Sequence, residues 1–309
     1  MLRTVAVLLV GLSASAHAAP WVGRARLVLL STCTLGSGAR TTAQELVVSR
    51  ETGAHVVVEG PRAFGIASAI RHAKAGAVYG VLAGDDVLVT ADEQATQPRD
   101  YTSAVWRVNR MDATRLVEGA VSAPALVVGT GAGRRAYVTV GRAGIDREDG
   151  STREDEFVID ELDVEGGSVR PVAQLTGQLA EPLGVDEEAG LLVHAVTPHA
   201  ASNVLVFDLH GGMPRELGSV GAAHEFLVVP RVGGGLGTGV VYDDKDGTHA
   251  LLLDGQRVPY DRTSIPVKKD ALSVRRIAGG FVVTTPDGAD ITVTAPPSTV
   301  LAPIGWLPR

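Results

Sequence analysis

The sequence predicts an almost entirely β-stranded protein built from repeated four-stranded units. From Leu27 onward, apolar residues come in short runs rich in Val and Leu, separated by Gly, Asp, Asn or Pro, which is typical of strands and turns. No long segment keeps the 3.6-residue period of an amphipathic helix. The same order of strands also recurs along the chain about every 45 residues, which indicates a repeat architecture.

The first eighteen residues have the pattern of a secretory signal peptide. Arg3 supplies a positive charge, residues 5–12 are apolar with one Gly, and Ala16-His17-Ala18 places small residues at the two positions that the signal peptidase requires. We expect cleavage after Ala18, which leaves 309 − 18 = 291 residues with a net charge of 27 − 35 = −8. The mature protein is then periplasmic or secreted.

A competing signal is Leu30-Ser31-Thr32-Cys33, which resembles a bacterial lipobox with Cys33 as the lipidated residue. Lipoboxes prefer Gly, Ala or Ser where Thr32 stands, and Arg24 and Arg26 shorten the hydrophobic lead. We therefore expect Cys33 to be a buried small residue on a strand. As the single cysteine of the chain, it cannot form an intramolecular disulfide.

The repeat is clearest when it is measured from a polar residue after the third strand of each unit. Asp163, Asp208 and Asp254 occupy that place and are 45 and 46 residues apart. Asn109 and Ser49 occupy it earlier in the chain at longer intervals, 54 and 60 residues, where polar insertions lengthen the loops. The predicted units span residues 24–61, 63–119, 121–177, 179–220, 222–263 and 268–303.

A four-stranded unit of this length resembles a blade of bacterial β-propellers in general, and the resemblance covers most of the mature chain. It implies that residues 19–309 form a single β-propeller domain of about six blades. Closing the ring needs a strand near residues 25–30 or 299–304 to complete a blade begun at the other terminus. No Trp-Asp dipeptide is present, and the Gly pairs match kelch repeats only in part, so no particular propeller family is indicated.

One segment departs from the strand pattern. Residues 64–75 could form a short helix, although Ile66, Ser68 and Ile70 also fit the alternation of a strand. Pro303 and the pair Pro296-Pro297 interrupt the last apolar segment, which makes the final strand the hardest to place.

Charge and hydropathy exclude two kinds of protein. A net charge of −7 and a pI near 5.6 give no basic surface for a phosphate backbone, which argues against a general nucleic-acid binder. No stretch after the signal peptide is apolar enough for a transmembrane helix. With only 13 aromatic residues in the chain, the core must be packed mainly by Val, Leu and Ala.

Four motifs suggest site chemistry, and each has a structural alternative that we favour. The segment 242–247 (Tyr-Asp-Asp-Lys-Asp-Gly) resembles the start of a calcium loop but reads better as a charged hairpin turn. The acidic loop at 146–156 could hold a cation or a basic partner, yet its interleaved arginines favour a solvated loop. The glycines of 129–133 would need a following helix to bind a dinucleotide, and residues 134–140 read as a strand.

The histidines are the fourth motif. His194 and His199 could ligate a metal, with His210 and His224 further on in the same pair of units, but no third ligand follows at a fixed spacing. We therefore favour hydrogen-bonded or surface roles for these histidines. The sequence contains no G-x-S-x-G or S-x-x-K motif, and we assign no catalytic, cofactor-binding or metal-binding residue.

These observations favour an extracytoplasmic β-propeller that acts as a binding or scaffolding protein without cofactor. Its partner would be a protein, or a small-molecule or glycan ligand, at a rim or in the central channel of the propeller. One alternative is a propeller enzyme, lactonase-like or glycan-cleaving, with a site assembled from several blades. A second alternative is a β-sandwich surface or adhesion protein.

Overall fold

A computed structural model describes most of the chain from Gly23 to Leu307. The described ranges are 23–35, 38–50, 57–64, 69–72, 78–92, 103–120, 125–129, 133–142, 155–196, 202–211, 213–221, 223–229, 237–261, 272–285 and 288–307. Within these ranges the regular elements are β-strands and there is no α-helix, which confirms the all-β prediction. The signal peptide and its cleavage site lie outside the described residues and stay predictions.

The strands belong to two compact units of the chain. Unit 1 consists of Met1–Gln94, Ala104–Arg115 and Val267–Arg309, and unit 2 of Ala95–Ser103 and Leu116–Pro266. Unit 1 therefore brings the two ends of the described chain together, whereas unit 2 is nearly continuous in sequence.

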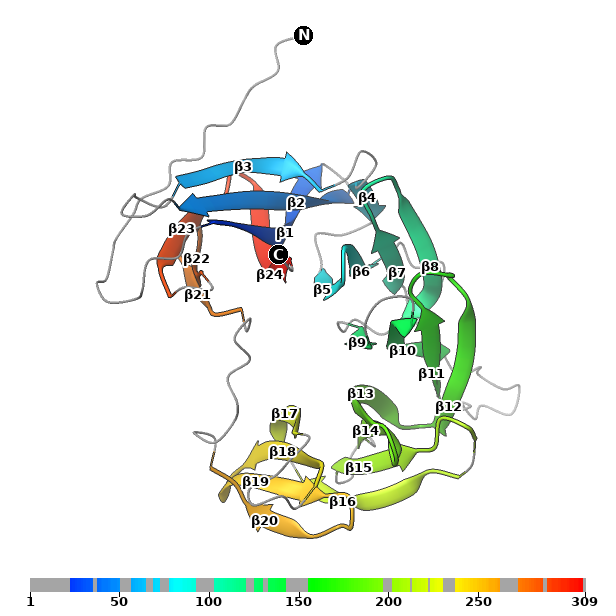
Figure 1. The fold of residues 1–309 in the computed structure, drawn as a ribbon. Helices are drawn as coiled ribbons and strands as arrows, with labels where there is room; N and C mark the ends of the chain where they lie inside the picture. Colours follow the sequence, from blue (N-terminus) through cyan, green and yellow to red (C-terminus); the bar gives the residue numbers. More distant parts are fainter. Residues whose placement is uncertain are drawn as a thin grey trace. The chain divides into compact units, whose positions relative to one another are not determined.

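Unit 2 contains three antiparallel groups of four strands each, in which the strands follow one another in chain order (Figure 1). The first group is β9 (Leu126–Val128), β10 (Arg135–Arg142), β11 (Glu156–Asp163) and β12 (Val169–Thr176). The second is β13 (Leu179–Asp186), β14 (Gly190–Val196), β15 (Ser202–Phe207) and β16 (Arg215–Gly221). The third is β17 (His224–Val229), β18 (Gly239–Asp244), β19 (Gly247–Leu252) and β20 (Arg257–Pro259).

A further four strands precede these groups, namely β5 (Tyr79–Ala83), β6 (Asp86–Asp92), β7 (Ser103–Val108) and β8 (Ala113–Ala120). They pair in the order β5-β6-β7-β8. A single residue pair, Val140 with Ala120, joins β10 to β8, so β5–β12 form one sheet of eight strands.

The first sheet of unit 1 joins the two ends of the chain. Its order is β24-β1-β2-β3, with β24 (Thr299–Leu307), β1 (Gly23–Leu35), β2 (Gly38–Arg50) and β3 (Val57–Ala63). A short strand, β4 (Ala69–His72), pairs with the part of β2 that β3 leaves free. The strand alternative for residues 64–75 is thus correct for Ala69–His72, and the helix expectation is wrong there.

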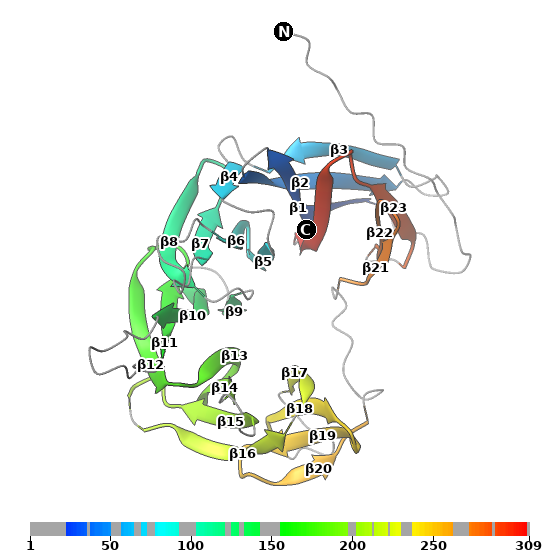
Figure 2. The same ribbon diagram turned by 180° about the vertical axis from the view of Figure 1, so that it is seen from behind.

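The other C-terminal sheet of unit 1 has three described strands, β21 (Val274–Ile277), β22 (Gly280–Thr284) and β23 (Asp290–Thr294) (Figure 2). The sequence predicted a four-stranded unit from 268 to 303. Its expected fourth strand, β24, pairs with β1, which is the pairing between the two termini that the sequence offered for residues 25–30 or 299–304. Both β21 and β24 are therefore terminal strands of their sheets.

The polar residues that marked the repeat have a structural role that explains their spacing. The Oδ1 atom of Asp163 accepts hydrogen bonds from the backbone N–H groups of Glu165 and Gly166, at 3.1 and 3.0 Å. The side chains of Asn109, Asp208 and Asp254 accept a backbone N–H two residues ahead in the same way, at 2.7 to 2.9 Å. Each residue thus closes an Asx turn between the third and fourth strands of its group.

Successive side chains of a strand point to opposite faces of its sheet and pack into separate hydrophobic cores. In β1, Leu27 and Leu29 face one cluster together with Phe281, whereas Val28 and Leu30 face another cluster together with Val89. In unit 2, Leu191 and Val193 of β14 pack on one side, and Leu192 packs on the other against the sheet β17–β20. These sheets are apolar on both faces because each has a packed neighbour on either side.

The sheets fit the predicted boundaries best in unit 2. The predictions 121–177, 179–220 and 222–263 match strands at 126–176, 179–221 and 224–259. The prediction 63–119 begins too early, because β4 belongs to the first sheet and the group starts at Tyr79.

Candidate functional site

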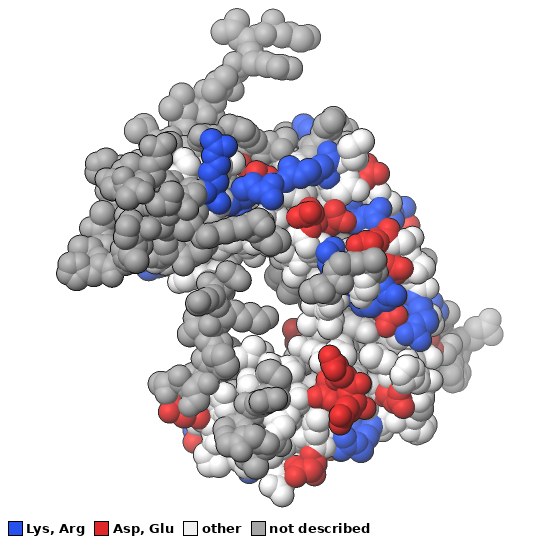
Figure 3. Space-filling view, viewed as in Figure 1, with Lys and Arg blue, Asp and Glu red and all other residues white. Residues whose placement is uncertain are grey.

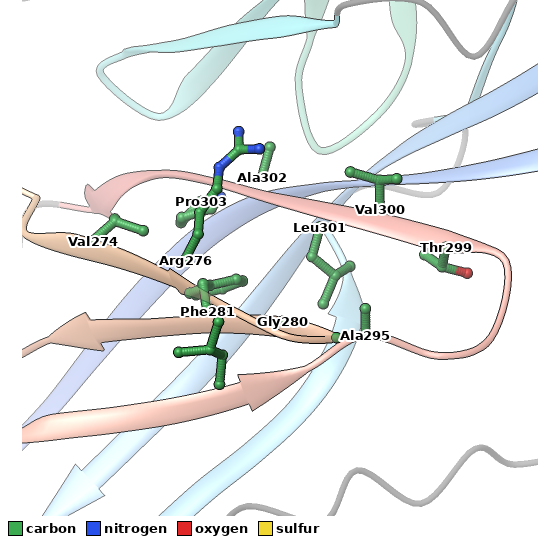
Figure 4. A pocket seen from close by; sticks show the side chains of 12 residues that line it. Val274, Arg276, Gly280, Phe281, Ala295, Thr299, Val300, Leu301, Ala302 and Pro303 are labelled. Carbon is green, nitrogen blue, oxygen red and sulfur yellow. The ribbon is translucent and has the colours of Figure 1, made fainter.

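The candidate site is a cleft in unit 1 between the terminal strands β21 and β24 (Figure 4). Its volume is about 490 Å³. Residues 299–303 line it from β24, and the sheet of β21 contributes Val274, Arg276, Ile277, Gly279, Gly280, Phe281 and Ala295. We call it the β21–β24 cleft.

No described strand pairs with the edge of β21 away from β22, and β21 directs backbone groups toward that open edge. The carbonyl of Ser273 accepts the N–H of Thr284 at 3.0 Å, and the register continues with Val274 opposite Val283 and Arg276 opposite Phe281. In an antiparallel pair, hydrogen-bonded and non-hydrogen-bonded positions alternate. The N–H and C=O groups of Val274 and Arg276 therefore point away from β22.

Strand β24 is open in the same way along its edge away from β1. The carbonyl of Ser298 accepts the N–H of Thr34 at 3.5 Å, so the alternation directs the backbone of Leu301 and the carbonyl of Pro303 away from β1. Five consecutive residues of β24 line the cleft, as expected when a cleft follows the edge of a strand and not one face. Pro303 fits here because no ladder hydrogen bond is lost at an open edge.

Arg276 places a cation in the cleft. Figure 4 shows its side chain extending from β21 toward β24. The side chain shares a face with Phe281, its cross-strand partner, whereas Arg275 pairs with Val282 and points to the opposite face. Neither arginine has an ion-pair or hydrogen-bond partner in the described part of unit 1.

The two units differ strongly in charge. Unit 1 has 16 Lys and Arg against 11 Asp and Glu, a difference of +5, and unit 2 has 12 against 24, a difference of −12. Basic side chains gather over the sheet that contains β2 and β3, and acidic ones over β13–β16 (Figure 3). The net charge of the whole chain hides this difference.

Unit 2 contains a second polar cluster, at one end of the interface between the sheets β13–β16 and β17–β20. The rings of His194 and Phe226 lie 4.1 Å apart, those of Phe226 and Tyr242 6.3 Å, and those of Tyr242 and His249 6.0 Å. His249 Nε2 lies 3.4 Å from Asp244 Oδ1, and Arg257 donates to Asp244 Oδ2 at 2.6 Å.

Three buried polar atoms of this cluster have no hydrogen-bond partner among the described residues: His194 Nε2, Tyr242 Oη and His249 Nε2. Burial raises the pKa of Tyr242, because the phenolate would be desolvated. Burial acts to raise the pKa of Asp244 too. The hydrogen bond from the backbone N–H of Asp246 and the positive charges of Arg257 and His249 outweigh burial, so the pKa of Asp244 is lowered.

Two buried tyrosines of unit 2 provide a test of these unpaired groups. Tyr137 donates to Glu161 Oε2 at 2.9 Å, whereas no described residue is a partner of the Tyr242 hydroxyl. We expect Tyr137→Phe to lower the free energy of unfolding by about 1.5 to 3 kcal/mol and Tyr242→Phe to raise it by about 1 kcal/mol. Urea unfolding of both variants measures the effects, and a loss of stability in Tyr242→Phe would contradict the assignment.

The structure describes the side chains of two of the four histidines named by the sequence, His194 and His210. His194 is buried, with Nδ1 3.9 Å from Glu181, and His210 is exposed in a turn. His199 lies outside the described residues, and only the backbone of His224 is described. The described residues contain no group of three or more His, Cys, Asp or Glu that could hold a metal ion.

The segment 242–247 forms the hairpin that the sequence favoured. Asp244 pairs with Gly247 across the turn between β18 and β19, and its carboxylate also contacts Arg257 and His249. Asp243 accepts from Thr248 Oγ1 at 2.7 Å. The side chains of Asp243 and Asp244 therefore interact with residues of their own sheet.

The structure describes Cys33 and both ends of the glycine run, but only the end of the acidic loop. Strand β10 begins at Arg135, directly after the glycine run 129–133, so no helix follows to bind a dinucleotide. Residues 146–154 of the acidic loop lie outside the described residues. Cys33 lies on β1 as expected, but it is only partly buried.

A second pocket, of about 570 Å³, lies over β10, β11 and β12. Its polar lining includes Arg142 and Asp160. Burial raises the pKa of Asp160, and Arg142 acts in the opposite direction.

Sequence reasoning missed the β21–β24 cleft. Arg276 lies in no recognisable motif, and the open edges depend on which strands pair across the chain. Pro303 was the local signal, because proline within a strand indicates an edge. No helix among the described residues is long and apolar enough to cross a membrane.

Comparison with known proteins gives distant similarities. No family model and no curated protein matches the sequence. TolB from Acinetobacter baumannii is 11% identical, with a TM-score of 0.48, over 92% of this chain and 67% of that one. BamB from Moraxella catarrhalis is 13% identical, with a TM-score of 0.31, over 84% and 82%.

An acylaminoacyl peptidase from Pyrococcus horikoshii is 10% identical, with a TM-score of 0.38, over 84% of this chain and 42% of that one. All three scores lie below 0.5, so these similarities assign neither a family nor a function.

Proposed function

We propose that this chain is an extracytoplasmic binding protein of the β-propeller type, which holds an extended segment of a partner protein in the β21–β24 cleft. The observation that carries the proposal is the pair of strands with open edges on the two sides of one cleft. Extended peptides bind such edges by strand addition, in which backbone hydrogen bonds provide affinity and neighbouring side chains provide selectivity.

The repeated sheets support the propeller part of the proposal. Four successive groups of four antiparallel strands run in chain order, and β24 joins the sheet of β1 as a closing strand would. In a sandwich, by contrast, strands distant in sequence pair within each sheet. A ring of six blades, with residues 19–309 as one domain, is the arrangement that these sheets fit best.

The position of β1 supports export with cleavage after Ala18. Leu27, Val28, Leu29 and Leu30 of β1 are all buried, and β1 pairs with both β2 and β24. Processing at Cys33, as in a lipoprotein, would remove most of this strand. Cleavage after Ala18 leaves it intact, because β1 begins at Gly23.

A proline substitution at the open edge tests the binding mode. Peptides are first selected from a displayed random library on the mature chain, and their affinities are measured by fluorescence anisotropy. Val274→Pro removes an N–H that points away from β22, so it leaves the ladder between β21 and β22 intact. We expect this variant to bind selected peptides about tenfold more weakly, because a buried hydrogen bond is left unmade.

N-methylation of the peptide at alternate positions provides the matching change on the ligand side. Strand addition predicts that one set of alternate positions is sensitive and the other is not. Binding that tolerates Val274→Pro and every N-methylated peptide would exclude strand addition in this cleft.

A further inference from the structure

We infer that the segment held in the β21–β24 cleft is acidic, with a carboxylate that pairs with Arg276. This inference rests on the proposed function and adds the chemical class of the partner. It is carried by three observations: the position of Arg276, the charge of unit 1 and the apolar walls of the cleft.

Arg276 is placed to meet a ligand. It is exposed, it lines the cleft, and no described residue pairs with it. A guanidinium offers a planar set of donors that matches a carboxylate, with two parallel hydrogen bonds. A peptide added to β21 would run beside Arg276, because the backbone of that residue faces the open edge.

The charge of unit 1 favours an anion over a cation as the partner of Arg276. Five arginines of unit 1 have no partner among its described residues: Arg24, Arg26, Arg40, Arg275 and Arg276. Without Arg3, which the expected cleavage removes, unit 1 has 15 Lys and Arg against 11 Asp and Glu, a net charge of +4. The unit therefore attracts acidic polypeptides over a Debye length, about 8 Å at physiological salt. The net charge of the whole chain, −7, would by itself favour a basic partner.

The apolar walls add a second requirement for the bound segment. Val274 and Val300 are 39% and 64% exposed, which is unusual for valines in strands. Val274 and Arg276 are two residues apart and share one face of β21, so a bound segment would meet both with an apolar residue and an acidic residue that are also two positions apart. The partner is therefore an extended acidic stretch of another protein.

The test uses eight-residue peptides of Thr and Val with a single central Glu, Gln or Lys, measured by fluorescence anisotropy on the mature chain. We expect the Glu peptide to bind about tenfold more tightly than the Gln peptide, and the Lys peptide more weakly still. The preference for Glu should shrink as salt is raised from 50 to 500 mM, because the ion pair is partly exposed.

Two adjacent arginines provide the matched variants. Arg276→Gln should remove the preference for Glu, whereas Arg275→Gln, which changes the same charge on the opposite face of β21, should leave it. Arg276→Glu should reverse the order, so that the Lys peptide binds best. A general loss of folding would not produce this reversal.

The outcomes separate this inference from the proposed function. If all three peptides bind equally and Val274→Pro weakens each, strand addition holds and the acidic assignment is wrong. If no peptide binds, both are wrong, and Arg275, Arg276 and Pro303 serve only to protect the edges from aggregation. A dimer in sedimentation that Arg276→Glu dissociates would assign the cleft to a second copy of this chain and overturn the assignment to another protein.

Discussion

Replacing Trp306 by alanine is expected to lower the free energy of unfolding by about 3 to 5 kcal/mol, as large aromatic truncations in cores do. Trp306 is 9% exposed and packs in the core cluster that contains Leu27, Leu29 and Phe281. The next residue, Leu307, points to the other face and enters the second core cluster. The end of β24 therefore contributes to the hydrophobic cores on both faces of the first sheet.

Val300 provides the control on the same strand, because it is 64% exposed. Val300→Ala should change the free energy of unfolding by less than about 0.5 kcal/mol. Urea unfolding followed by circular dichroism measures both variants. Equal effects of the two substitutions would show that β24 is not part of the folded core.

The second large effect is expected at Gly190, where β13 turns into β14. Its φ of +107° is a conformation that side chains rarely adopt, and an added Cβ would lie 2.2 Å from the carbonyl oxygen of Phe207. The clashing atom belongs to the backbone of β15, so β14 and β15 would have to move apart. We expect Gly190→Ala to cost about 2 to 4 kcal/mol, from backbone strain and overpacking together.

Gly247 separates these two causes. Its φ is +125°, but an added Cβ would meet no atom within 4 Å. Gly247→Ala should therefore cost only the strain, about 1 to 2 kcal/mol. The difference between the two variants in thermal unfolding measures the clash, and a larger loss at Gly247 than at Gly190 would contradict the packing described for β14 and β15.

The repeat could be predicted from sequence because its markers are local. Asn109, Asp163, Asp208 and Asp254 each bond to backbone N–H groups two or three residues ahead, so the signal lies within a few residues of each turn. The hairpin at 242–247 was predictable for the same reason. Turns that depend on residues close in sequence can be recognised without knowing which distant strands pair.

Pairing between distant segments leaves no such mark. Residues 69–72 read equally as helix or strand, and their pairing with Ala39–Thr42 of β2 decides the outcome. Ring closure predicted that residues 25–30 or 299–304 join a blade at the other terminus, and Pro303 marks an edge, but neither indicates that β24 pairs with β1 and leaves β21 open beside it. The cleft is a consequence of that choice, so it could not be found before the sheets were known.

The charge difference between the units was hidden for a related reason. Unit 1 combines segments from both ends of the chain, and its excess of Lys and Arg is spread over three stretches. Whole-chain composition averages these with the acidic middle of the sequence. Only the assignment of segments to units shows that the cleft belongs to the unit with the positive net charge.

Amide hydrogen exchange of the mature chain, with and without the Glu-containing peptide, tests the central claim most directly. Strand addition predicts that the amides of Val274 and Arg276, or that of Leu301, become protected when the peptide binds, because these N–H groups point to the open edges. The amide of Arg275, which faces β22, should change little. Protection confined to unit 2, or none at the edges of β21 and β24 despite binding, would contradict the account.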